Sequence, residues 1–130
     1  MISSIRLDGS TARMHLPGAA DTKAFVTYIG EVLCPTLKQG DIVVMDNLAV
    51  HKSPRVVALV EAVGAEVRFL PAYSPDLSPI EKMWSKIKAL LRSAEARTTE
   101  ELDQAIRHVF SKITARDAVG YFAACGYSII

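Results

Sequence analysis

Two carboxylates, Asp46 and Glu81, stand where a metal site could form. Asp46 follows the apolar run IVVM, residues 42–45, which is too short for a helix and is typical of a buried strand. Glu81 falls in the first turn of a predicted helix, after the proline-rich segment 71–79. Parallel sheets place ligands beyond the carboxyl ends of their strands, and Mg²⁺ prefers carboxylate oxygens. The pair, with 34 residues between its members, therefore predicts a metal site.

Each acid also has a purely structural interpretation. Ser78, Pro79 and Glu81 fit the capping box Ser-x-x-Glu with proline at the first helical position, so Glu81 could simply hold the end of its helix. Asp46 and Asn47 could be turn residues, because such side chains often bond to the backbone where a chain leaves a sheet. For each acid taken alone, the metal-binding and the structural interpretation both stay open.

The elements that must position these acids begin with a hairpin. Residues 2–7 and 12–16 read as strands around the turn Asp8-Gly9-Ser10, since Asp-Gly favours a tight hairpin turn. From Asp21 an amphipathic helix is predicted, which Pro35 ends. Its apolar face comprises Phe25, Tyr28, Ile29, Val32 and Leu33.

The centre of the chain reads as strand, helix, strand. Residues 42–45 are predicted to be a strand buried on both faces, and Ser53-Pro54 to open a helix that Gly64 closes. The apolar run 67–70 is the next strand, so the two strands should be parallel. Three more helices are predicted. One covers about residues 79–92, one begins after the N-cap Thr98, and one covers about residues 115–124.

Composition sets broad bounds on function. The chain has 130 residues, of which 50% are hydrophobic and 22% charged, which indicates one folded domain rather than a disordered segment. The net charge is only +1, so any nucleic-acid role must rest on a local patch. Cys34 and Cys125 fit no metal-ligand spacing and read as buried thiols. No signal peptide or membrane span is predicted, and we expect a cytoplasmic protein.

Two segments resemble the catalytic domain of DDE transposases, specifically the mariner-like group of bacterial insertion sequences. They are DNLAVHKS, residues 46–53, and GAEVRFLPAYSPDLSPIEKMWSKIKALLR, residues 64–92, at the spacing described above. The resemblance implies an α/β fold with a ribonuclease-H-like mixed sheet flanked by helices. It also implies cleavage of DNA ends and joining of a 3′ hydroxyl to target DNA, with two Mg²⁺ or Mn²⁺ ions. Asp46 would be the second acid of the catalytic triad and Glu81 the third.

The chain departs from the family pattern at the first acid. That aspartate should lie on a central strand before the hairpin, and no residue here matches it; Asp8 is in turn context instead. We therefore expect residues 1–130 to be a single, N-terminally truncated catalytic domain that lacks the central strand and is inactive alone. Its expected partners are transposon-end and target DNA and either the missing N-terminal half or a full-length transposase. The complete enzyme should be a homo-oligomer, nucleoid-associated on DNA and not bound to a membrane.

Further residues are expected around the site. Cations of the 79–92 helix suit phosphate contacts or a solvated face. His51 and Lys52 could contact the phosphate of the scissile strand or orient Asp46, and an ordinary loop position is the alternative. Tyr73 is expected mainly as an aromatic lid over the helix, with stacking or hydrogen bonding near the site as the alternative. Trp84 should set the position of Glu81 by packing. The helix cations are Lys82, Lys86, Lys88 and Arg92, and the supporting residues are Asn47, Tyr73, Ser78, Pro79 and Trp84.

Two other functions are compatible with the sequence. A non-catalytic DNA-binding or regulatory module derived from a transposase would keep the cationic helix without needing the acids. An unrelated small metal-dependent hydrolase would use Asp46 and Glu81, with or without Asp8 or Asp41.

Overall fold

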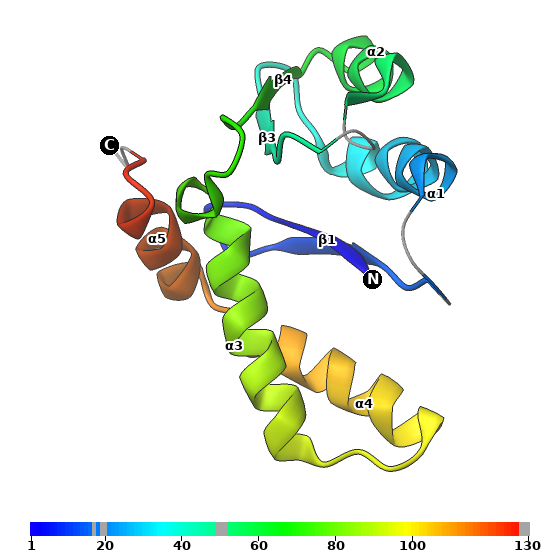
Figure 1. The fold of residues 1–130 in the computed structure, drawn as a ribbon, viewed down its shortest axis with the longest axis vertical. Helices are drawn as coiled ribbons and strands as arrows, with labels where there is room; N and C mark the ends of the chain where they lie inside the picture. Colours follow the sequence, from blue (N-terminus) through cyan, green and yellow to red (C-terminus); the bar gives the residue numbers. More distant parts are fainter. Residues whose placement is uncertain (17, 19–20, 49–51, 128–130) are drawn as a thin grey trace. The chain divides into compact units, whose positions relative to one another are not determined.

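The computed structural model describes residues 1–16, 18, 21–48 and 52–127 (Figure 1). The chain divides into two compact units. The first comprises Met1–Ser4 and Ala12–Ser78, and the second Ile5–Thr11 and Pro79–Ile130. The hairpin of β1 (Ile2–Ile5) and β2 (Thr11–Met14) contributes residues to both units, and each unit is considered by itself below.

The first unit contains the predicted strand-helix-strand crossover. β3 (Ile42–Met45) and β4 (Glu66–Phe69) pair in parallel, with Met45 opposite Phe69, and α2 (Pro54–Ala62) connects them. Pro54 occupies the first helical turn, although Ser53 makes no side-chain cap. Gly64 follows the helix at a φ of +82°, a conformation that glycine adopts at little cost. The parallel prediction is confirmed, with β4 starting one residue earlier than expected.

The helical segment before β3 is more complex than predicted. It starts at the N-cap Asp21 and runs as α1 (Thr22–Thr27), the π-helix η1 (Tyr28–Leu33) and the 3₁₀ turn η2 (Cys34–Thr36). The segment therefore continues one residue past Pro35, because proline is tolerated in the first turn of a helical element. The predicted apolar face is confirmed, with Val32 half-buried at its margin.

A single core fills the first unit. α2 packs on β4, α1 and η1. The hydroxyl of Tyr28 donates to the carbonyl of Ala12 at 2.7 Å, which ties this helical segment to β2, and burial raises the pKa of Tyr28. The buried residues of this core are Phe25, Tyr28, Ile29, Leu33, Cys34, Met45, Val56, Val60 and Ala65.

The prediction that β3 is buried on both faces is wrong. Val43 and Met45 face the core, whereas Ile42 is 50% exposed and Val44 39% exposed. The exposed face continues onto β4, where Glu66 lies opposite Ile42 and Arg68 opposite Val44. A parallel strand is buried on both faces only when both faces of its sheet are covered, and here the helices of the first unit cover one.

The second unit is built on three helices. α3 (Pro79–Ala94), α4 (Thr99–Phe110) and α5 (Ala115–Ala124) match the predictions, and both α4 and α5 pack on α3. Thr98 Oγ1 accepts from the amide of Glu101, as expected of an N-cap. The core of this unit comprises Met83, Ile87, Ile106, Val109, Phe110, Ile113, Ala118 and Cys125.

The tip of the hairpin lies against α5. Asp8 Oδ1 accepts from the amide of Ser10 at 2.8 Å and from its hydroxyl at 2.6 Å, which makes Asp8 a turn residue. Gly9 has a φ of +88°, and a Cβ there would lie 2.7 Å from the backbone nitrogen of Ala115. Glycine is therefore required both for the turn and for the close approach of the two backbones.

The mixed α/β class is confirmed, and the architecture is consistent with a ribonuclease-H-like fold without its first strand. Within the described ranges, the strands form two separate two-stranded sheets rather than one mixed sheet. Cys34 and Cys125 are buried free thiols, as predicted. Among the helices described, none has the length and apolar character to span a membrane.

Candidate functional site

Asp46 lies at the carboxyl end of the parallel pair. It directly follows the buried Met45, whose carbonyl accepts from the amide of Leu70 at 2.8 Å, and its side chain is partly exposed. The chain thus leaves β3 at Asp46 and β4 at Leu70 from the same edge of the sheet. This is the edge where parallel sheets bind their ligands.

The residue after Asp46 supplies an unsatisfied oxygen. Within the part of the chain described, Asn47 Oδ1 is buried and has no hydrogen-bond partner. A buried acceptor without a partner is unfavourable unless a ligand, ion or water satisfies it. Asn47 Oδ1 and the carboxylate of its sequence neighbour Asp46 are both hard oxygen donors, which is the ligand chemistry that suits Mg²⁺ or Mn²⁺.

Glu81 lies on the exposed side of α3. It is in the first turn of the helix, and its carbonyl accepts from Ser85 Oγ at 3.1 Å. Lys88 and Arg92 follow at positions i+7 and i+11, so they continue the same helical stripe, about 10 and 16 Å along the axis. We call Glu81, Ser85, Lys88 and Arg92 the acid-cation stripe.

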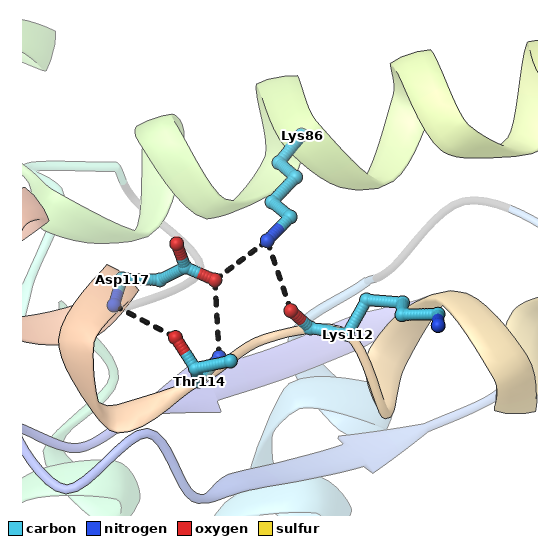
Figure 2. A network of polar contacts seen from close by, with 4 residues as sticks. All are labelled: Lys86, Lys112, Thr114 and Asp117. Atoms are coloured by element: carbon cyan, nitrogen blue, oxygen red, sulfur yellow. Dashed lines mark hydrogen bonds and ion pairs between the residues drawn. The ribbon is translucent and has the colours of Figure 1, made fainter.

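Lys82 and Lys86 are four residues apart and lie on a different stripe of α3, which is rotated about the helix axis from Glu81. Figure 2 shows that Lys86 Nζ donates to Asp117 Oδ2 at 2.6 Å and to the carbonyl of Lys112 at 2.9 Å. The ammonium group of Lys86 is therefore engaged within the second unit, whereas Lys82 is exposed. The four cations of α3 do not form one continuous face.

Asp117 is a structural residue that the sequence prediction missed. Its carboxylate also accepts from the amide of Thr114 at 3.0 Å, and Thr114 Oγ1 accepts from the amide of Asp117 in return (Figure 2). The hydrogen bond from Lys86, followed by that from Thr114, lowers the pKa of Asp117. The pattern Thr114-x-x-Asp117 was the available signal, since it has the spacing of a capping box.

The packing face of α3 is centred on Met83, a residue that the sequence analysis did not name. Met83 and Ile87 are almost fully buried, while Trp84 is half-buried and meets the ring of Phe110 edge-on, with centroids 6.0 Å apart. Trp84 thus anchors α3 to α4. This contact leaves Glu81 on the solvent side of the helix.

The loop before α3 contains the 3₁₀ turn η4 (Pro75–Leu77), and Ser78 and Pro79 behind it are buried. The side chain of Tyr73 is fully exposed. Because α3 belongs to the other unit, the expectation that Tyr73 forms a lid over this helix stays a prediction. The backbone at Tyr73 has a φ of +58°, which directs the chain through a turn in a conformation that few residues other than glycine adopt.

The remaining sequence-predicted residues are less informative. His51 lies outside the described residues. Lys52 is exposed directly before the N-cap of α2. Asp41 lies at the amino end of β3, where its carboxylate accepts from the amide of Lys38 at 2.8 Å. Asp41 and Asp46 are therefore at opposite ends of the strand, about 16 Å apart along it.

Asp46 belongs to the first unit and Glu81 to the second, so their meeting at one metal site is a proposal. Among the described residues, no group of three or more His, Cys, Asp or Glu side chains is placed to hold a metal. Asp8 and Asp41, the alternative third acids, are both engaged in turns.

Comparison with known families gives one match. The model of the DDE superfamily endonuclease family matches residues 1–103, which include both Asp46 and Glu81. A search of curated proteins finds no relative that matches the chain. Enzymes of the matched family act on DNA and generally use divalent metal ions. The match covers more than half of the sequence and agrees with the α/β architecture, and the chain therefore belongs to the DDE superfamily endonucleases.

Proposed function

We propose that this chain takes part in DNA strand cleavage and strand transfer during transposition, as a relative of the mariner-like insertion-sequence transposases. The observation that carries the proposal is the position of Asp46 at the carboxyl edge of a parallel strand pair, within the stretch that matches the endonuclease family. The transposition chemistry and the mariner-like group go beyond the family match and are part of the proposal.

In this proposal Asp46 and Glu81 hold the metal, with Asn47 Oδ1 as a neighbouring oxygen donor. Two divalent ions, Mg²⁺ or Mn²⁺, would supply activation of the attacking oxygen and stabilisation of the leaving oxygen. Trp84 fixes α3 through Phe110, and so holds the helix that carries Glu81.

The catalytic triad needs a third acid. No residue of the chain matches the first motif of the family, and Asp8 and Asp41 are turn residues. We propose that this acid comes from a segment outside residues 1–130, either the N-terminal half of a transposase or a full-length copy. The chain alone should then be inactive in cleavage and bind metal weakly.

Paramagnetic broadening by Mn²⁺ tests whether Asp46 and Glu81 share a metal. Amide NMR spectra of the full chain should lose intensity around both residues at the same Mn²⁺ concentration. In Asp46→Asn both regions should recover, because the ion would have lost one of its two carboxylates. Glu100→Gln is the matched control, since Glu100 is an acid in the first turn of α4 just as Glu81 is in α3.

Broadening around only one of the two acids, or broadening around Glu81 that persists in Asp46→Asn, would contradict a shared site. Cleavage of DNA by the purified chain alone would contradict the need for a third acid and favour a self-sufficient hydrolase.

A non-catalytic DNA-binding module is the second candidate, and the acid-cation stripe favours it. Lys88 and Arg92 are exposed on one stripe of α3 and suit phosphates whether or not a metal is present. In this case Asp46→Asn and Glu81→Gln would leave DNA affinity unchanged with or without Mg²⁺. A catalytic role predicts instead that Mg²⁺ increases the DNA affinity of the wild type and does not increase that of these two variants.

A further inference from the structure

Tyr73 combines two features that its own fold does not explain. Within the described residues, only Tyr73 and Glu95 have positive φ without being glycine. Glu95 directly follows the last residue of α3, a position where helices commonly end in the left-handed conformation. Tyr73 ends no helix. It lies in a turn between β4 and η4, at a φ of +58°.

The side chain of Tyr73 is also fully exposed. Its relative exposure is 101%, whereas the next most exposed large hydrophobic residue among those described, Leu48, reaches 54%. The ring therefore contributes no packing that would offset the backbone strain. Glycine or asparagine would suit the turn better, and such violations of local preference concentrate at functional positions.

The strand topology places Tyr73 at the same edge of the sheet as Asp46. Leu70 donates its amide to the carbonyl of Met45, the residue before Asp46, and Tyr73 follows three residues later. Three residues span at most about 10 Å. Both residues belong to the first unit, so this proximity does not depend on the second unit.

We propose that Tyr73 stacks on an unpaired DNA base that flanks the phosphate bound at Asp46. This inference rests on the proposed function, since it assumes that DNA reaches the carboxyl edge of β3. Bases along a strand are about 3.4 Å apart, so a ring within about 10 Å of that edge reaches a base one to three nucleotides from the phosphate. Stacking on an aromatic ring tolerates any base, and thus Tyr73 would recognise an unpaired base rather than a sequence.

The test uses the full chain and a DNA duplex with a short single-stranded tail. The tail carries a fluorescent purine analogue whose emission is quenched by stacking, and affinity is measured by anisotropy at low salt. Wild type and Tyr73→Phe should both quench the analogue. Tyr73→Asn keeps a residue that tolerates positive φ but removes the ring, so quenching should be lost. Its affinity for tailed DNA should fall by about 5- to 150-fold, while affinity for a blunt duplex stays unchanged.

Two controls separate stacking from other effects. Leu102→Gln removes an exposed apolar side chain from α4 and should change neither quenching nor affinity. The thermal midpoint of Tyr73→Asn should equal or exceed that of the wild type, which shows that the variant is folded. Equal quenching and tailed-DNA affinity in wild type and Tyr73→Asn would overturn this inference and leave the proposed function intact. Failure of the wild type to bind either DNA would overturn both.

Discussion

Lys86 of α3 is joined to Asp117 of α5 by an ion pair of 2.6 Å (Figure 2). Both side chains are about one-third exposed, and Asp117 is at the same time the acid of the capping box that begins α5. One carboxylate thus starts one helix and attaches it to another. Lys86, which the sequence assigned to DNA, has this structural role in the second unit.

Replacing Lys86 should destabilise the fold. In Lys86→Met, the Asp117 carboxylate and the Lys112 carbonyl lose a charged donor, which should lower the free energy of unfolding by about 1 to 2 kcal/mol. This corresponds to a decrease of roughly 3 to 8 °C in the thermal midpoint. Lys82→Met, on the same stripe one turn earlier, should change the stability by less than about 0.5 kcal/mol. Equal effects would show that the ion pair contributes nothing specific.

The stability should depend on pH through Asp117. Its pKa is lower in the folded state, chiefly because Lys86 donates to the carboxylate. The ionised form therefore stabilises the fold fully above about pH 4, the ordinary Asp value, and this contribution is lost as the pH falls through the lower folded-state pKa. Urea unfolding should show a deficit in stability for Asp117→Asn near pH 6 that shrinks as the pH falls below the ordinary Asp value of about 4. A deficit that does not vary with pH would assign the effect to the cap geometry alone.

Three glycine-to-alanine variants should separate the strain of a positive φ from the steric clash of an added Cβ. Gly9→Ala combines positive φ with a Cβ 2.7 Å from the Ala115 nitrogen, so it should lower the free energy of unfolding by about 2 to 4 kcal/mol. Gly40→Ala has a φ of +90° with no atom within 4 Å of the added Cβ, so only about 1 to 2 kcal/mol should be lost. Gly120→Ala, in the open on α5, should stabilise by about 0.5 to 1 kcal/mol. If Gly9→Ala were no worse than Gly40→Ala, the hairpin tip would not be held against α5.

The acid-cation stripe should bind DNA phosphates. The double variant Lys88→Gln/Arg92→Gln should weaken duplex binding for any sequence and decrease the slope of log affinity against log salt by about 2, one phosphate contact for each cation. Fluorescence anisotropy across a salt series measures this slope. Arg107→Gln/Lys112→Gln removes the same charge from exposed positions around the end of α4. Equal slopes for the two double variants would mean that only net charge matters.

Much of the local structure could be predicted because it depends on neighbouring residues. The spacing of Phe25, Tyr28 and Ile29 predicted a helical face, Thr98 begins α4 as a side-chain cap, and the two apolar runs joined by α2 required a parallel pair. The resemblance of residues 46–53 and 64–92 to DDE transposases, with Asp46 and Glu81 in the right order and spacing, predicted the DDE endonuclease family, which the family match confirmed.

Tertiary contacts decided the rest, because burial and charge pairing depend on residues that are distant in sequence. Ile42 and Val44 are apolar like their neighbours, yet only the coverage of one face by helices determined that they would be exposed. Lys86 resembles Lys88 in sequence, but Asp117, 31 residues away, made it a structural cation. Tyr73 is an aromatic residue in a proline-rich loop. The positive φ and full exposure arise from how the turn leaves the sheet edge, which local pattern does not specify.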